Sequence, residues 1–146
     1  MTLGEGDAAP PFSAVDQNGT ITTLSQFKGQ WLVLYFYPKD FTSGCTREAC
    51  EFRDNYEVLK KLAAVVGVSA DFQESHAKFA AKYFLPFTLL ADEEKKISRS
   101  FGAQAAILTR RFTFLIDPGG KIAKIYRSVN PKTHAQTIVS DLQSLK

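Results

Sequence analysis

The chain carries short apolar runs separated by amphipathic segments, and one run ends a few residues before a cysteine. Residues 31–37 are seven apolar or aromatic side chains in a row, WLVLYFY. A short run rich in Val, Tyr and Phe predicts a strand buried on both faces, which is typical of a parallel sheet. Pro38 ends this strand, because proline cannot donate a hydrogen bond to a sheet ladder. Other apolar runs predict further strands at 64–69, 87–90, 112–116 and 122–126.

The segment that follows this strand has the apolar spacing of a helix. Apolar side chains recur at intervals of four, three, four, three and four residues, at Cys45, Ala49, Phe52, Tyr56, Leu59 and Ala63. This spacing lines one side of a helix and places Cys45 near its start, on the side that faces the core. Cys50 lies off this stripe, beside Arg53 and Glu57. We therefore expect the two cysteines to have different surroundings.

Local signals predict the elements at the beginning and in the middle of the chain. Asn18-Gly19 is a dipeptide favoured in two-residue hairpin turns, so a small antiparallel ribbon is expected around it, with a helical turn at 25–28 after it. Asp71 with Glu74 fits a capping box for a helix that ends at about Tyr83. Asp92 can cap a further helix, which extends to about residue 100.

The order of the elements indicates the fold class. Asn130 followed by Pro131 predicts the start of a last helix, and a turn at 117–120 joins two of the strands into a hairpin. A strand–helix–strand–helix unit followed by a hairpin and a terminal helix is the plan of the thioredoxin-like fold. We therefore predict a single α/β domain over 1–146, with a central mixed sheet flanked by helices and an N-terminal β-hairpin extension.

Composition narrows the classes of function. With 45% hydrophobic and 23% charged residues, the chain of 146 residues has the composition of a globular domain. The net charge of +3 comes with scattered basic residues, so nucleic acid is not an expected partner. No apolar run approaches the roughly 20 residues of a membrane span, and no signal peptide is visible. We therefore expect a cytoplasmic protein without a membrane partner, in which two cysteines favour chemistry over a structural disulfide.

Other kinds of site are not indicated by the sequence. It contains no glycine-rich phosphate loop and no G-x-G-x-x-G motif. His76 and His134 lie on separate expected helices without metal-ligand spacing, so both imidazoles are expected at the surface. The acidic residues are expected as solvated charges on helix surfaces. No metal and no cofactor is therefore predicted.

Cys45 is the candidate nucleophile. A helix N-terminus stabilises a thiolate through free backbone N–H groups and the helix dipole. A basic side chain would add to this effect, and Arg111, which opens the strand at 112–116, is the candidate for it. The pattern also leaves open a simpler alternative, in which the two cysteines are unrelated thiols buried in the core.

The spacing of the two cysteines limits how they can react with each other. In a regular helix, Cα atoms five residues apart are separated by about 8.7 Å. A disulfide needs a Cα separation of about 4.4–6.8 Å. Cys45 and Cys50 therefore cannot bond while the helix is intact. This favours a switching pair, in which one cysteine is oxidised and the other attacks it after local unwinding.

These residues resemble a known family. Pro38, Thr42 and Cys45 match the P-x-x-x-[TS]-x-x-C motif of the peroxiredoxins. The longer string YFYPKD-x-T-x-GCT-x-EAC is similar to the Q-type class, the bacterioferritin comigratory proteins. The resemblance covers nearly the whole chain, from Gly6-Asp7 to the segment 111–117.

The resemblance implies that the chain reduces hydrogen peroxide and organic hydroperoxides. Cys45 would attack the O–O bond and become a sulfenic acid. Thr42 and Arg111 would hold the peroxide oxygens, the Cys45 backbone N–H would add a donor, and Pro38 would shield the thiolate from water. Cys50 matches the resolving cysteine, which would form an intramolecular disulfide with Cys45. A thioredoxin or glutaredoxin would then restore both thiols. The resemblance also implies a monomer, in contrast to the ring-forming peroxiredoxins.

Two positions depart from the commonest pattern of the class. Phe41 stands where Asn is frequent, and Ser43 stands where Pro is frequent. Neither change removes a reacting group. Glu48 is expected to be a local hydrogen-bonding or helix-start residue. Arg47 is a rival of Arg111 for the cysteine and is expected to point to solvent instead.

Two functions of different classes remain open at this point. In the first, the chain is a thioredoxin-dependent, atypical two-cysteine peroxidase, an antioxidant enzyme. In the second, the same cysteine switch serves a redox-sensing binding module without turnover. Repeated turnover with a thiol reductant separates the two, because a sensor needs only one oxidation event.

Overall fold

The computed structural model describes residues 3–145, which form two sheets and the helices around them. The small sheet pairs β1 (Ser13–Val15) with β2 (Ile21–Thr23). The large sheet contains β3 (Leu32–Phe36), β4 (Ala64–Ser69), β5 (Thr88–Ala91), β6 (Thr113–Ile116) and β7 (Ile122–Tyr126). The helices are η1 (Leu24–Phe27), α1 (Ser43–Asp54), α2 (Tyr56–Leu62), α3 (Gln73–Tyr83), α4 (Lys96–Ser100) and α5 (His134–Leu145).

Strand pairing brings distant parts of the chain together at the carboxyl end of the central strand of the large sheet. The strand order is β5-β4-β3-β6-β7, with β3 parallel to β4 and antiparallel to β6. The carboxyl end of β3 therefore lies beside the amino end of β6, where the N–H of Phe36 donates to the carbonyl of Phe112 at 2.7 Å. The loop that follows β3 thus meets the residues directly before β6, which include Arg111.

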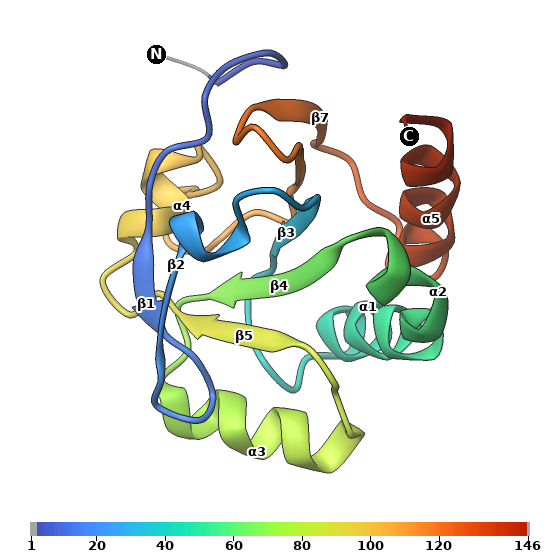
Figure 1. The fold of residues 1–146 in the computed structure, drawn as a ribbon. Helices are drawn as coiled ribbons and strands as arrows, with labels where there is room; N and C mark the ends of the chain where they lie inside the picture. The colour runs from blue at the N-terminus through green and yellow to red at the C-terminus, as the bar shows by residue number, and fades with distance from the viewer. Residues whose placement is uncertain (1–2, 146) are drawn as a thin grey trace.

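The core lies on both faces of this mixed sheet. All five residues of β3 are buried, which confirms the expected central strand. Val33 and Tyr35 pack with α1, α2, α3 and α5, whereas Leu34 and Phe36 pack with α4 and the N-terminal segment on the opposite face. Figure 1 shows α1, α2 and α5 together on one side of the sheet, and β1, β2 and α4 on the other. The predicted thioredoxin-like α/β architecture with an N-terminal hairpin is confirmed.

The N-terminal hairpin has a longer connection than the sequence predicts. Its register pairs Val15 with Ile21, and the N–H of Asp16 donates to the carbonyl of Thr20 at 2.9 Å. Three residues, 17–19, therefore form the loop, and Gly19 adopts a φ of +82°. This is the arrangement of a three-residue hairpin loop that ends on a left-handed residue, instead of a two-residue turn.

The cysteine helix is interrupted at Asn55, so the single helix expected over 45–63 is wrong. Asn55 has φ −99° and ψ 7°, and its side-chain amide donates to the carbonyl of Glu51 at 2.8 Å. Asparagine competes with helical hydrogen bonds in this way, and the chain restarts as α2. The apolar stripe survives the interruption, because Phe52 and Leu59 are both buried.

The starts of α3 and α4 also differ from the sequence prediction. Asp71 does not cap α3, because its carboxylate accepts from the Ser69 hydroxyl and the Asp40 N–H instead. Asp92 accepts from the N–H groups of Ile97 and Ser98, so it does cap α4. The helix itself begins later than expected, at Lys96.

The start of the last helix moves as well. α5 begins at His134, after a turn in which Asn130 accepts from the N–H of Lys132. None of the helices in the described part of the chain, α5 included, is long and apolar enough to cross a membrane.

The Phe52 side chain is expected to be a main contributor to stability. It is fully buried and stacks on Tyr35 with 4.7 Å between the ring centroids. We predict that Phe52→Ala lowers the free energy of unfolding by about 3–5 kcal/mol, because it leaves a cavity that the core cannot close. Urea unfolding measures this change. Val58→Ala, at a position on α2 that is 46% exposed, is the matched control, with an expected change below about 0.5 kcal/mol.

Candidate functional site

The site lies where the loop after β3 enters α1. Pro38 is partly buried two residues after the end of β3, and Thr42 is the extended N-cap residue of α1, with φ −82° and ψ 154°. Cys45 is the third residue of the helix. The first N–H groups of a helix have no partner within the helix, so they face the region in front of its N-terminus. The sequence prediction of a cysteine at a helix start is confirmed.

Cys45 and Arg111 are in contact. The Cys45 side chain is 1% exposed, and Nη1 of Arg111 lies 3.5 Å from its sulfur. A Cβ atom on Gly44 would lie 3.0 Å from Nη2 of Arg111, so the glycine lets the guanidinium lie close against the first turn. Arg47 is exposed and pairs with Glu51 at 3.2 Å. The structure therefore places Arg111, and not Arg47, beside Cys45.

Glu48 holds Arg111 in place. Its Oε1 accepts from the same Nη1 of Arg111 at 2.9 Å, and the side chain is 0% exposed. Burial raises the pKa of Glu48 to about 7, and the charge of Arg111 opposes this shift. The expectation that acidic side chains are solvated is therefore wrong for Glu48. The sequence predicts a local hydrogen-bonding role for Glu48, but its bond to Arg111 joins residues 63 positions apart. Glu48 therefore also bonds outside its own helix.

Thr42 and Pro38 lie shortly before Cys45 in the sequence, in the loop that leads into α1. The Thr42 hydroxyl donates to the carbonyl of Lys39 at 2.8 Å, and the residue is exposed. That bond leaves the hydroxyl oxygen free to accept from another donor. Pro38 lies between the buried strand and this loop. Their proposed roles toward a peroxide stay predictions.

Cys50 has different surroundings from Cys45, as expected. Both thiols are free, Cys45 is buried and Cys50 is partly exposed. Partial burial raises the pKa of the Cys50 thiol, so this group keeps its proton at neutral pH. Cys50 lines an open cavity of about 530 Å³ with residues of the first turns of α1 and of the segment before α5: Ser43, Gly44, Thr46, Arg47, Asn130, Pro131 and Lys132.

Both histidines are buried, so the prediction of surface imidazoles is wrong. His134 is 4% exposed, its Nε2 lies 2.8 Å from the Thr113 hydroxyl, and burial lowers its pKa to about 4. His76 is 0% exposed and bonds to Asp40 in the loop before Cys45. The sequence signal for Asp40 is its place after a buried strand, where α/β folds gather polar side chains.

One group of side chains in the described chain has the spacing of metal ligands. Asp40, Asp71 and His76 offer ligand atoms that lie within 4.8 Å of one another. The two nitrogens of His76 already face the Asp40 carboxylate at 2.7 Å and the Leu90 carbonyl at 2.9 Å. Asp71 likewise accepts from Ser69 and from the N–H of Asp40. The group is a hydrogen-bonded network whose ligand atoms are already engaged.

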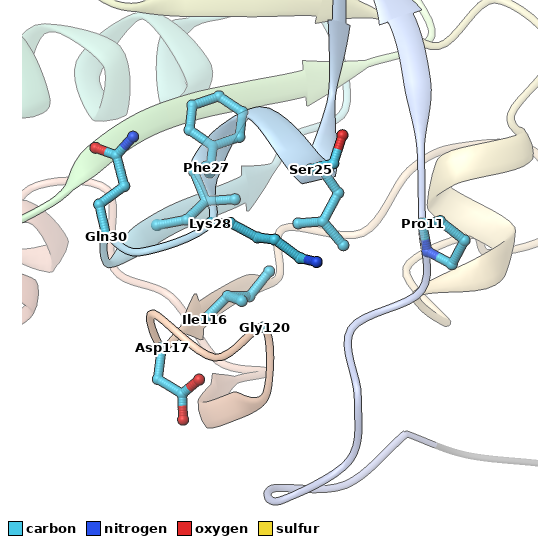
Figure 2. Close-up of a pocket in the computed structure, with 10 residues that line it drawn as sticks. Pro11, Ser25, Phe27, Lys28, Gln30, Ile116, Asp117 and Gly120 are labelled. Carbon is cyan, nitrogen blue, oxygen red and sulfur yellow. The ribbon is translucent and has the colours of Figure 1, made fainter.

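A second cavity lies at the opposite end of β3. It has a volume of about 160 Å³ between η1 and the turn that precedes β7. Figure 2 shows Ser25, Phe27 and Lys28 on one side of it, and Ile116 and Asp117 on the other. Its lining is largely apolar and contains neither cysteine nor histidine. It therefore does not share the chemistry of the region around Cys45.

Comparison with known proteins identifies the family. Residues 5–125 match the AhpC/TSA family. The chain is 46% identical over 147 residues to the chloroplastic peroxiredoxin Q of Sedum lineare, covering 97% of this chain and 79% of that protein. It is 43% identical over 155 residues to peroxiredoxin Bcp of Bacillus subtilis (strain 168), covering 100% and 97%.

A solved structure agrees with these relatives. The bacterioferritin comigratory protein of Xanthomonas campestris superposes with a TM-score of 0.88 at 33% sequence identity, over 92% of this chain and 91% of that one. The fold, the sequence and the cysteine at the start of α1 point to the same group. The chain therefore belongs to the AhpC/TSA family, as a peroxiredoxin of the Q type.

Proposed function

We propose that this chain is a thiol-dependent peroxidase whose chemistry takes place at Cys45. The observation that carries the proposal is the contact of 3.5 Å between Arg111 Nη1 and the buried Cys45 sulfur. A fixed positive charge beside a thiol at a helix N-terminus favours the thiolate, which is the nucleophilic form. The names of the relatives support the same activity.

The first step is the attack of the Cys45 thiolate on one oxygen of the peroxide. The O–O bond breaks, the sulfur becomes a sulfenic acid, and the second oxygen leaves as water or an alcohol after it takes up a proton. Arg111 and the free N–H of Cys45 donate hydrogen bonds to the oxygens and stabilise the charge that develops on the leaving oxygen. Thr42 orients the peroxide, and Pro38 shields the sulfur from water.

The second step is resolution by Cys50. Its thiol attacks the sulfenic sulfur, the S–O bond breaks, and a disulfide and water form. Because α1 holds the two cysteines five residues apart, its first turns must unwind before this step. A thiol reductant then restores both cysteines by thiol–disulfide exchange, and we propose a thioredoxin or a glutaredoxin for this role.

The proposal also covers the class of peroxide that the chain reduces. The Xanthomonas campestris protein is described as having alkyl peroxide reduction activity. We propose organic hydroperoxides as well as hydrogen peroxide as substrates of this chain. A monomeric state and a cytoplasmic location stay predictions.

The proton of Glu48 makes the stability of this site depend on pH. Burial raises its pKa to about 7, against 4.5 for the free group. Between these two values the folded protein holds a proton that the unfolded chain releases. The contribution of this group to stability is therefore complete below the lower value and is lost as the pH rises through the upper one. At high pH the charged Glu48 is held by Arg111 alone.

Variants of the two cysteines separate the two steps. We expect Cys45→Ser to abolish peroxide consumption, because no nucleophile remains. We expect Cys50→Ser to leave the first oxidation intact and to stop turnover with thioredoxin, since the disulfide cannot form. Stopped-flow measurement of peroxide loss and of steady-state turnover checks both. Normal peroxide consumption by Cys45→Ser would show that Cys45 is not the nucleophile.

Arg111 and its neighbour Arg110 form a matched pair for testing the charge at the sulfur. Arg110 is exposed, whereas Arg111 contacts Cys45. We predict that Arg111→Gln slows the first oxidation by about 100-fold or more, because a donor to the developing charge is lost. Arg110→Gln should retain the normal rate. Equal rates for the two variants would contradict the role of Arg111.

The pH dependence of stability tests the buried proton. We predict that the stability of the protein relative to its Glu48→Gln variant falls by about 2–3 kcal/mol between pH 5 and pH 8, because only the carboxyl group must lose a proton. Urea unfolding at both pH values measures it. Glu57→Gln, at a side chain that is 85% exposed, should show no such change. A pH-independent difference for Glu48→Gln would mean that Glu48 titrates normally.

A further inference from the structure

The loop that precedes Cys45 is attached to the protein very unevenly. Its first part, residues 37–41, bonds to β4, to α3 and to the segment between them. Its last part and the first turn of α1 have few such attachments. Ser43 is exposed, and the cap residue Thr42 makes no side-chain bond to the helix. Within two residues the chain therefore passes from a segment bonded to β4 and α3 to two exposed residues, Thr42 and Ser43, which have no such bonds and precede the buried Cys45.

Asp40 is the centre of the fixed segment. Its side chain is 1% exposed, and its Oδ1 accepts from the Tyr37 hydroxyl at 2.6 Å. Its Oδ2 accepts from the Ser75 hydroxyl at 2.8 Å and faces Nδ1 of His76 at 2.7 Å. Its backbone N–H donates to Asp71 at 2.8 Å. A buried carboxylate with this number of partners is strongly held, because each lost bond would leave a buried polar group unpaired.

His76 links this carboxylate to the sheet. Its Nε2 lies 2.9 Å from the carbonyl of Leu90 in β5. A carbonyl only accepts hydrogen bonds, so Nε2 carries a proton and donates. Its Nδ1 lies within hydrogen-bond distance of Asp40 Oδ2, at 2.7 Å. His76 therefore joins β5, α3 and the loop before Cys45 through two bonds of fixed direction.

Phe41 adds an apolar attachment at the end of the fixed segment. Its ring lies edge-on to Phe79 with centroids 5.1 Å apart, and 6.4 Å from the ring of Tyr83. Lys82 places its ammonium 5.9 Å from the same ring. Phe41 also has a φ of +65°, a conformation that bulky side chains rarely adopt. The contacts with α3 hold the backbone in this conformation, where the chain turns toward the helix.

We propose that residues 37–41 are a fixed anchor, held by His76 acting as a positioning residue through Asp40, so that unwinding for resolution begins only after Thr42. The anchor keeps the start of α1 aligned with Arg111 for the first oxidation. The segment beyond it is free to unwind when Cys50 approaches. This inference rests on the proposed function, because it assigns parts to the two steps of that reaction.

The two substitutions at Asp40 that test the anchor differ in hydrogen bonding. Asp40→Ala removes all three side-chain bonds. Asp40→Asn can keep them, because the amide oxygen accepts from Tyr37 while the NH₂ group donates to Ser75 and to Nδ1 of a neutral His76. Asp92→Ala is the control for lost stability alone. Asp92 is also buried and accepts two N–H bonds, but at α4, on the other face of the sheet.

The experiment measures the two steps separately. In a Cys50→Ser background, quenched-flow trapping of the sulfenic acid gives the rate of the first oxidation. In the two-cysteine protein, mass spectrometry of the quenched reaction at saturating peroxide follows the sulfenic acid and the disulfide together, and the conversion of the first into the second gives the rate of disulfide formation. We expect Asp40→Ala to slow the first step by about 10- to 100-fold, since misplaced groups lose their alignment. Disulfide formation should stay within about threefold of the parent rate, because its unwinding lies beyond the anchor.

The controls decide between an anchor and a general loss of structure. Asp40→Asn should restore the first step to within about threefold of the parent rate, and Asp92→Ala should lower the melting temperature without slowing it. The proposal is overturned if Asp40→Ala reacts at the parent rate, if it slows both steps equally, or if Asp40→Asn is as slow as Asp40→Ala.

A milder variant and the parent protein complete the test. If Asp40→Ala does not fold, Ser75→Ala removes one bond to Asp40 from outside the loop. It should slow the first step by about two- to fivefold and spare the second, and an unchanged first step would overturn the anchor. Failure of the proposed function has a different signature, namely a parent protein that forms no sulfenic acid at Cys45.

Discussion

Cys45 and Cys50 lie five residues apart in one uninterrupted helix, α1, and helical geometry sets the distance between them. At about 8.7 Å between Cα atoms, they are too far apart for a disulfide. The remainder of the site depends on this constraint. The folded helix aligns Cys45 with Arg111, whereas a bond between the cysteines requires the same helix to unwind. One short segment must therefore have two conformations that serve successive steps.

The fold sets a buried sheet beside the helix that must unwind. β3 is fully buried between its two neighbours, and β6 delivers Arg111 to the same edge of the sheet. Glu48 is the link between the sheet and the helix, since it is part of α1 and is bonded to Arg111. Unwinding that reaches Glu48 releases a buried carboxyl group together with Cys45. The cost of unwinding α1 therefore includes the ion pair as well as helical hydrogen bonds.

The sequence predicts the parts of this arrangement that depend on local pattern. The apolar run at 31–37 and the stripe through Phe52 determine the central strand and the buried face of α1, because burial follows directly from periodicity. The position of Arg111 before a predicted strand makes it a candidate neighbour of Cys45, but only the family motif favours it over Arg47, since 66 residues separate it from the cysteine. The expectations for Asp71 and His76 are wrong for a related reason, because their partner, Asp40, comes from another part of the chain. The roles of Thr42 and Pro38 toward a peroxide stay predictions.

Hydrogen–deuterium exchange of the reduced and the peroxide-oxidised protein tests most directly whether α1 must unwind. Amide protection reports local opening of each helix and strand separately. Once mass spectrometry has verified the Cys45–Cys50 disulfide, the amides in the first half of α1 should exchange much faster than in the reduced protein, while those of β3 and β6 remain protected. If α1 were equally protected in both forms with the disulfide present, the central claim of an obligatory unwinding would be contradicted.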